Sequence, residues 1–193
     1  MAWDTAATKQ KILDAARDEF AEHGPTGTTV DRIAAVAGVN KERIYNYFGN
    51  KRDLFMTVMA SESARVAAEV AFDPTAEDPV GDYAGRIFDY HVDHPHLLRL
   101  ILWEGLTVPG EVAEEAARSK HYREKVEVVA KAQADGILRD DLPPGAVIFS
   151  IMALAAWWNA SPHVARLLTE YDDGDLAARR EAVVTAARRL AAG

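Results

Sequence analysis

The stretch covering residues 28–48 restricts the possible fold more than any other part of the chain. Ala34 is small enough for a second helix to approach closely, and Gly38, four residues later, can adopt the positive φ of a sharp turn. Val39 fills the corner, and Ile44, six residues past the glycine, is spaced to anchor the second helix on the first. This spacing predicts a helix-turn-helix.

Threonine and asparagine side chains mark where the helices of this region begin. Thr28 and Thr29 offer oxygens that can cap the first helix, and Asn40 can cap the second. Asn50 is placed in the same way to cap a long helix that starts at residue 51. The second helix then exposes most of the side chains between residues 41 and 47.

Helical periodicity also runs through the rest of the chain. Ile12, Ala16 and Phe20 recur every four positions and form one apolar stripe, which Gly24-Pro25 ends. No segment shows the sustained apolar–polar alternation of β-branched residues that is typical of a strand. The predicted fold class is therefore all-α. In addition to a helix at residues 8–23 and the helix-turn-helix, helices are predicted at residues 51–71, 80–93, 96–105, 111–135, 145–160, 162–170 and 175–192.

The charge distribution suits contact with a polyanion, although the chain as a whole is acidic. The net charge is −8, but residues 1–55 contain eight Lys/Arg and eight Asp/Glu and are neutral. Residues 40–52 contain four basic side chains and one acidic side chain, that of Glu42. Such a patch can contact phosphates. A solvated helix face is the commoner origin of a patch of this kind, so charge alone does not decide.

A helix fixed by such a turn can lie in the major groove with its first residues toward the base edges. Lys41 and Arg43 match O6 and N7 of guanine, and Asn46 matches N6 and N7 of adenine. Tyrosine hydroxyls, a lysine ammonium and the N-terminus of the preceding helix match phosphates. The predicted DNA contacts are Thr28, Thr29, Lys41, Glu42, Arg43, Tyr45, Asn46, Tyr47 and Lys51.

Three other interpretations compete with DNA binding. The helix pair could be an ordinary hairpin of a bundle, but a basic and aromatic helix after so short a turn argues against that. An all-helical enzyme is disfavoured because the chain has no Gly-rich phosphate loop and no His-Glu-x-x-His motif. A helical module that dimerises and binds only protein would need no basic helix.

Residues 8–55 resemble the TetR/AcrR family of one-component transcriptional regulators. The resemblance rests on residues 12–16, 20–24, 28–30, 33–34, 37–39, 44–48 and 50–55. It implies a homodimer that binds a palindromic operator, in most cases as a repressor, and releases the operator on binding a small molecule. It also implies that DNA is contacted by Thr29, Lys41, Arg43, Tyr45, Tyr47 and Lys51.

The resemblance implies two domains in this chain. We expect a three-helix, helix-turn-helix DNA-binding domain at residues 1–52 and a helical effector-binding and dimerisation domain at residues 53–193. The predicted function is a ligand-responsive transcriptional repressor that is not an enzyme and needs no cofactor. The segment Asn40-Lys41-Glu42 departs from the family, which more often has Ser or Thr followed by a small residue. Glu42 could accept a hydrogen bond from N4 of cytosine or support Lys41 and Arg43, and we favour the second role.

The helices at residues 145–160 and 175–192 form the predicted dimer interface, because the corresponding pair in the family forms a four-helix bundle with its partner. Small residues of the first helix permit close packing, and larger ones supply apolar area. The small residues are Ala153, Ala155, Ala156 and Ala160, and the larger ones are Ile148, Ile151, Met152 and Leu154. A purely intramolecular core is the alternative. A dimer would hold two half-sites about one DNA turn apart, ~34–36 Å.

A ligand pocket is expected between helices of the C-terminal domain. Any one of its candidate walls can equally belong to the core. These candidates are Phe88, His91, Leu98, Trp103, Tyr122, Phe149, Met152, Trp157 and Asn159. Trp103 and Glu104 together could hold a cation, or Glu104 could lie in solvent at a helix end, and we favour the second interpretation.

The histidines at positions 91, 94 and 96 raise the question of a metal site. His91 and His94 share a helical face, but Pro95 intervenes before His96, so we favour a surface loop and predict no metal. The chain has no cysteine, which excludes disulfides and thiolate ligands. With no apolar run of membrane-spanning length and an acidic Asp4 near the start, a cytoplasmic protein is expected.

Overall fold

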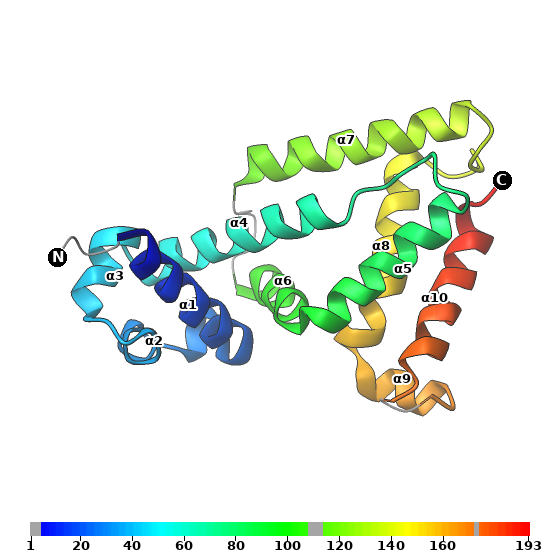
Figure 1. Ribbon diagram of the computed structural model, residues 1–193. Helices are drawn as coiled ribbons and strands as arrows, with labels where there is room; N and C mark the ends of the chain where they lie inside the picture. Colours follow the sequence, from blue (N-terminus) through cyan, green and yellow to red (C-terminus); the bar gives the residue numbers. More distant parts are fainter. Residues whose placement is uncertain (1–4, 108–113, 172–173) are drawn as a thin grey trace. The chain divides into compact units, whose positions relative to one another are not determined.

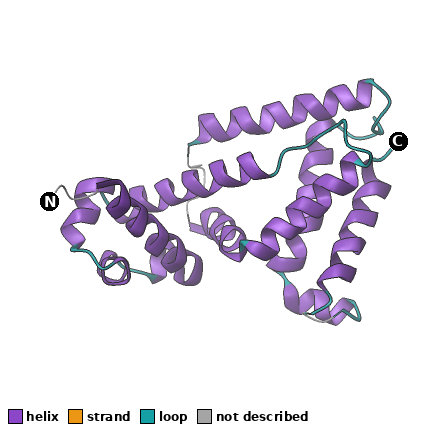
Figure 2. Cartoon of the chain, viewed as in Figure 1, coloured by secondary structure: helices purple, strands orange, loops and turns teal. Residues whose placement is uncertain are grey.

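The computed structural model describes residues 5–107, 114–171 and 174–193, and this part of the chain contains ten α-helices (Figure 1). The helices are α1 (Thr5–Gly27), α2 (Val30–Ala37), α3 (Lys41–Phe48), α4 (Lys51–Glu69), α5 (Pro79–Asp93), α6 (Pro95–Thr107), α7 (Glu115–Ala134), α8 (Pro144–Ala160), α9 (Pro162–Leu168) and α10 (Leu176–Ala191). Among the described residues the backbone forms one isolated β-bridge, between Leu138 and Ala192, and no strand (Figure 2). The predicted all-α fold is confirmed.

The first helix is broken where the sequence predicted its end. Gly24 has φ 70° and ψ 168°, so α1 kinks there and continues for only one further turn to Gly27. A Cβ at Gly24 would lie 2.8 Å from the indole ring of Trp103, a distance that only a glycine permits. The kink therefore has two effects. It ends the long part of α1, and it lets α6 approach closely.

One compact unit comprises Met1–Arg65 and His96–Arg118. Its core is a single apolar cluster built on α1 to α4, and α6 adds one fully buried side chain to it, that of Leu100. Trp103 packs against the same cluster from one turn further along α6. The helices of the helix-turn-helix and α6 thus share one core, and burial of this apolar surface is what stabilises the unit.

Polar side-chain contacts join α6 to α1 and α4 within this unit. The Nη1 of Arg99 donates to Glu22 at 2.6 Å, and Nε2 of His96 lies 2.9 Å from a carboxylate oxygen of Glu62. Burial acts to raise the pKa of Glu62, but its contacts with His96 and with nearby arginines prevail and hold the pKa below its usual value. A buried carboxylate of this kind requires its partners, so the start of α6 is tied to α4.

The second compact unit comprises Val66–Pro95 and Ser119–Gly193. In it α5 packs against both α8 and α10, and those two helices contact each other (Figure 1). Lys125 of α7 is buried and donates from Nζ to the carbonyl of Val70, at 2.9 Å, and to the hydroxyl of Tyr83, at 3.2 Å. Burial lowers the pKa of Lys125 to about 8. This ammonium group joins the end of α4 to α5 and α7.

The two units do not divide the chain where the sequence analysis placed its domain boundary. Residues 53–65 of α4 and residues 96–118 share the unit of the helix-turn-helix. It stays a prediction that residues 1–52 form the DNA-binding domain and that residues 53–193 form the effector-binding and dimerisation domain. No single described helix is long and apolar enough to cross a membrane, and α8 with α9 reaches that length only as a pair bent by 92°.

Candidate nucleic-acid interface

The helix-turn-helix has the caps and the turn that its sequence predicts. Thr29 caps α2 by accepting a hydrogen bond from the N–H of Arg32 at 3.2 Å. Gly38 adopts a left-handed conformation, with φ 67° and ψ 35°, and its N–H bonds back to α2. Asn40 then caps α3, accepting from the N–H of Glu42 at 3.0 Å. These local bonds fix the angle at which α3 leaves α2.

Burial orients α3 about its own axis. Ile44 is its one fully buried residue, while Tyr47 and Phe48 pack partly against the core. Side chains predicted to contact DNA lie on the opposite, exposed face. They are Lys41, Glu42, Tyr45 and Asn46, with Arg43 half-buried beside them. The helix therefore presents polar and basic groups over its first two turns, as a recognition helix does.

Two cations are already in contact with other groups at this face. Lys41 pairs with Asp31 of α2 at 3.1 Å, and that hydrogen bond raises the pKa of the lysine. Lys9 of α1 lies 5.4 Å from the centroid of the Tyr47 ring. Exposed pairs of this kind contribute little to stability, so both lysines can exchange these contacts for phosphates at small cost.

The structure corrects the prediction for Thr28. Its side chain is fully buried and cannot reach a phosphate. Instead, Oγ1 of Thr28 donates to a carboxylate oxygen of Glu19 in α1 at 2.6 Å. The two adjacent threonines therefore have different roles, since Thr29 is exposed and caps α2 while Thr28 faces inward.

Glu19 is a residue of this site that the sequence analysis missed. In addition to Thr28, it accepts from Nε and Nη2 of Arg32 at 3.1 and 3.2 Å. Burial acts to raise the pKa of Glu19, but hydrogen bonds from Arg32 and Thr28 outweigh it and lower the pKa below its usual value. Only its apolar neighbours on α1 were used to predict the helix, so an acidic side chain on the polar flank went unnoticed.

The N-terminus of α4 holds the last of the predicted contact residues, Lys51. Asn50 caps α4 as predicted, accepting from the N–H groups of Arg52 and Asp53 at 2.9 and 3.1 Å. Lys51 is half-buried, and its Nζ donates to the backbone carbonyl of Thr28 at 2.8 Å. An ammonium group has three donors, so this bond leaves two for a phosphate.

The predicted ligand-pocket residues are divided between the two compact units. Trp103 and Leu98 belong to the unit of the helix-turn-helix, and Trp103 packs on α1. Phe149 and Trp157 are exposed, by 74% and 62%, which corrects their assignment as pocket walls in the single chain. His91 is buried, and its Nδ1 has no hydrogen-bond partner. Tyr122 lies on α7, Met152 and Asn159 lie on α8, and none of the three lines the cavity described next.

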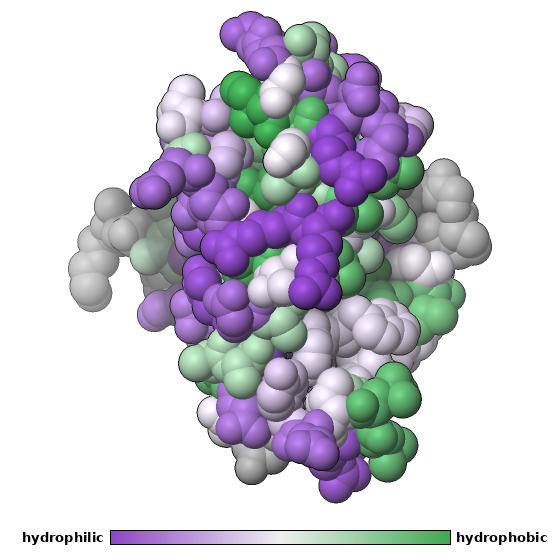
Figure 3. All heavy atoms as spheres, turned by 90° about the vertical axis from the view of Figure 1, so that its right-hand side faces the viewer, coloured by the Kyte–Doolittle hydropathy of each residue, from purple (hydrophilic) through white to green (hydrophobic). Residues whose placement is uncertain are grey.

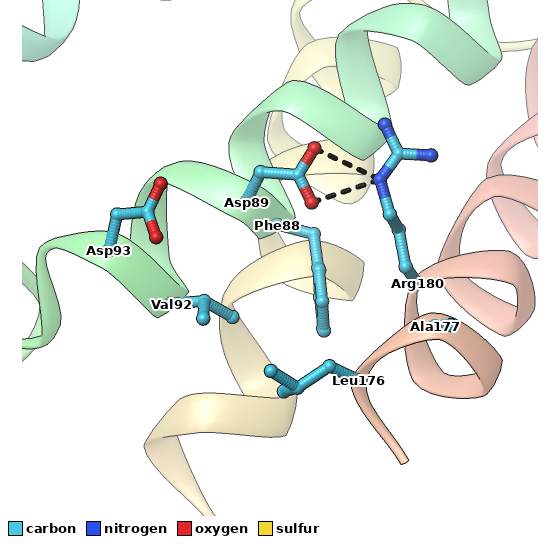
Figure 4. Close-up of a pocket in the computed structure, with 7 residues that line it drawn as sticks. All are labelled: Phe88, Asp89, Val92, Asp93, Leu176, Ala177 and Arg180. Carbon is cyan, nitrogen blue, oxygen red and sulfur yellow. Dashed lines mark hydrogen bonds and ion pairs between the residues drawn. The ribbon is translucent and has the colours of Figure 1, made fainter. Parts of the chain in front are cut away.

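One cavity, of about 220 Å³, lies between α5 and α10 in the second unit (Figure 4). Of the predicted ligand residues only Phe88 lines it. Its apolar side is formed by Phe88, Val92 and Leu176, and at its edge Nε of Arg180 donates to both oxygens of Asp89 at 2.9 Å (Figure 4). The cavity is smaller than most sites for drug-sized molecules, which span ~300–1,000 Å³.

The three histidines have separate environments. His91 is buried in α5, and burial lowers its pKa to about 4. His94 ends α5 and its ring lies 4.3 Å from that of Tyr90, whereas His96 bonds to Glu62. Among the described residues no three His, Asp or Glu side chains are grouped so as to hold a metal ion.

Two short helices are joined by a turn at Gly38, and the second of them has a basic exposed face. In a chain that is otherwise largely helical, this arrangement defines a helix-turn-helix DNA-binding protein. Comparison with known proteins agrees with this class. The family profile described as "Bacterial regulatory proteins, tetR family" matches residues 12–58, and the one described as "Tetracyclin repressor-like, C-terminal domain" matches residues 79–189.

Relatives match along nearly the whole chain. The HTH-type transcriptional repressor SCO4008 of Streptomyces coelicolor is 40% identical over 188 residues, covering 97% of this chain and 96% of its own. The HTH-type transcriptional repressor NicS of Pseudomonas putida is 28% identical over 189 residues, covering 90% and 86%. The crystal structure of the transcriptional regulator SCO4942 from Streptomyces coelicolor superposes with a TM-score of 0.84 at 33% identity, covering 95% and 98%.

The chain belongs to the TetR family of transcriptional regulators. It is accordingly a regulator of transcription and not an enzyme, and its named relatives SCO4008 and NicS are repressors.

Proposed function

We propose that this protein is a homodimeric repressor that binds a palindromic operator and releases it when a small molecule binds. The observation that supports this proposal most directly is the exposed face of α3, where basic and amide side chains lie opposite a single buried anchor, Ile44. A helix so held can enter the major groove without moving its own core.

Within that interface the contacts divide by chemistry. Arg43 and Lys41 are proposed to read guanine, and Asn46 to read adenine, because their side chains match those base edges. Thr29, Tyr45, Tyr47 and Lys51 are proposed to contact phosphates, which set the register of the protein on the duplex. Glu42 lies between Lys41 and Arg43 on the exposed face, and its proposed role is to support them.

The proposed dimer forms through α8 and α10. Phe149, Ala153 and Trp157 recur every four residues along α8 and are all exposed, so they form an apolar stripe without cover in the single chain. Figure 3 views the side where α9 and α10 lie and shows apolar areas beside a hydrophilic band on that face. An exposed apolar stripe is typical of a protein–protein interface, and a symmetric partner covers it with the same stripe.

The cavity between α5 and α10 is the proposed effector site. Apolar walls with a charged pair at the edge are typical of sites for small organic molecules. Release then requires that the effector bind the DNA-free conformation more tightly than the DNA-bound one. If so, Val92→Trp, which fills the cavity, leaves operator affinity intact but abolishes release by any compound that releases the wild type. If the same compound concentration released both the variant and the wild type from DNA, this assignment would be contradicted.

The proposed location of the protein is the cytoplasm.

Selection of bound duplexes from a random DNA pool tests the central proposal. The expected product is an inverted repeat whose half-sites are about one turn apart, ~34–36 Å. Affinity should fall with rising salt despite the acidic pI of about 5.2, because phosphate contacts release counterions. If no duplex is enriched and no salt-dependent binding is detected in dilute buffer, the proposed function is wrong.

A further inference from the structure

Thr28 and Glu19 form a buried contact directly behind the N-terminus of α2. Thr28 precedes the cap residue Thr29, and its hydroxyl donates to the Glu19 carboxylate at 2.6 Å. Thr28 is fully buried, and only 11% of the Glu19 side chain is exposed. Neither side chain is therefore placed to touch DNA, yet both lie next to a helix end that is.

The same carboxylate also holds α2 from inside its first turn. Arg32 donates to Glu19 from Nε and Nη2, at 3.1 and 3.2 Å. Thr28 lies just before the cap and Arg32 lies three residues after it. Two attachments, on either side of the cap, fix both the position and the rotation of the helix start relative to α1. Bonds to a charged acceptor are also stronger than neutral ones.

A third bond holds Thr28 from the side of α4. Lys51 donates to the Thr28 carbonyl at 2.8 Å. The side chain of Thr28 is thus bound to α1 and its backbone to α4, all within the same compact unit. Thr28, the residue that leads into α2, is therefore bound through both its side chain and its backbone and has little freedom to move.

We propose that Glu19 and Thr28 are positioning residues for DNA binding, which act by fixing where the N-terminus of α2 meets a phosphate. The inference rests on the proposed DNA contact of Thr29 and α2. Free N–H groups at a helix N-terminus bind phosphate well only when they are aimed correctly, and errors of about 0.5 Å matter.

The sign of the effect separates positioning from simple electrostatics. Near a DNA-binding face, removal of a carboxylate ordinarily strengthens binding because repulsion of phosphates is lost. Loss of Glu19 would also leave the charge of Arg32 without a carboxylate partner, with only its contact to His23 at 2.8 Å remaining. A positioning role predicts the opposite result, weaker binding after the acidic group is removed.

The first test uses Thr28→Val, which keeps shape and charge but removes the hydroxyl donor. We expect operator affinity to fall about tenfold, with the slope of log K against log salt unchanged because no phosphate charge is lost. Thr28→Ser keeps the hydroxyl and should bind within about twofold of wild type. The matched control is Thr57→Val, which loses a hydroxyl bond to the Asp53 carbonyl within α4 itself and should bind as wild type does.

The second test uses Glu19→Met and its conservative counterpart, Glu19→Gln. Glu19→Met should weaken binding although a negative charge has gone, whereas Glu19→Gln keeps an acceptor for Thr28 and should restore most of the affinity. In a double-mutant cycle, Thr28→Val added to Glu19→Met should cost little more, since both break the same contact. Circular dichroism establishes that each variant is folded at the assay temperature.

The outcomes distinguish this inference from the proposed function. If the wild type binds its selected operator and both Thr28→Val and Glu19→Met fold and bind as tightly, the positioning role is overturned while the repressor assignment stands. Stronger binding by Glu19→Met would also overturn it. If the wild type binds no DNA, the proposed function itself fails.

Discussion

Gly24 and Gly27 lie three residues apart at the end of α1, but only one of them is confined by its neighbours. Gly24 has a positive φ and directly faces the ring of Trp103. Gly27 has no such φ, and a Cβ there would meet only the Cβ of His23, at 3.4 Å. The pair therefore offers a matched comparison of what a single methyl group does in two settings.

We predict that Gly24→Ala lowers the free energy of unfolding by roughly 2–4 kcal/mol, from backbone strain and crowding against the indole. Gly27→Ala should change it by less than about 1 kcal/mol. Urea denaturation followed by circular dichroism measures both. Similar losses for the two variants would mean that the Trp103 contact does not confine this position.

His91 sets a pH dependence of stability. Its folded pKa of about 4 lies below the ordinary value of 6.5 because the neutral ring is buried. As pH falls from 6.5, the unfolded chain takes up a proton that the folded chain refuses. The contribution of the buried neutral His91 to the free energy of unfolding is therefore complete above pH 6.5 and is lost progressively toward pH 4. The free energy of unfolding changes with a slope of at most about 1.4 kcal/mol per pH unit.

The corresponding prediction compares His91→Leu with the wild type by urea denaturation between pH 7 and 5. The variant should lose part of the pH dependence in this range, where few carboxylates titrate. His163→Gln, at an exposed position of α9, is the control and should keep the wild-type slope. An unchanged slope in His91→Leu would place the acid sensitivity elsewhere.

Single residues also show where inference from sequence stops. The Thr28-Thr29 pair predicts a helix cap, and the cap is there, but no pattern says which threonine turns inward. That choice depends on Glu19, nine residues earlier, whose carboxylate lies close only after α1 and α2 have packed. A side chain's partner across two helices is a tertiary property, so Thr28 was assigned to the wrong surface.

At the scale of elements, α3 is where base reading and backbone contact can be separated. We predict that Arg43→Ala weakens binding to the selected operator far more than to random DNA, by about 1–3 kcal/mol, because its proposed contact is to a base edge. Lys51→Ala should weaken both alike. Fluorescence anisotropy with the two duplexes measures this, and equal losses for Arg43→Ala would remove it from base readout.

Elements with strong local signatures were predictable within a few residues. Gly38, Asn40 and Asn50 lie at the turn and caps they predicted, because those bonds are formed by neighbours in sequence. The partners of α6 were not predictable in this way. Leu100 and Trp103 belong to a helical stripe that fits any apolar surface, and only the kink at Gly24 selects α1 as the place where it packs.

For the molecule as a whole, the exposed apolar stripe of α8 leads to a prediction about the oligomeric state. Trp157→Glu should convert the proposed dimer to a monomer and lower operator affinity by at least tenfold, because one head alone contacts only a half-site. Leu106→Glu, on an α6 side chain that is 75% exposed, is the control and should leave the mass unchanged. Light scattering after gel filtration decides, and a dimeric Trp157→Glu would exclude this face.

The pocket was the least predictable feature at this scale. Its walls come from α5 and α10, whose contact joins segments about ninety residues apart, as the bond between Asp89 and Arg180 illustrates. Large aromatic residues were taken as its walls, but Phe149 and Trp157 point outward instead. An apolar residue on a helix can face a core, a cavity or a partner chain, and composition does not separate these.

The seat of Trp103 on the kink of α1 has a practical consequence for anyone who wishes to transplant this DNA-binding specificity. An exchange of only the first 58 residues between relatives would leave Gly24 opposite a foreign α6, whose side chain at the Trp103 position need not fit. A hybrid repressor should therefore carry α6 from the same parent as α1, although more than forty residues of chain separate that graft from α3.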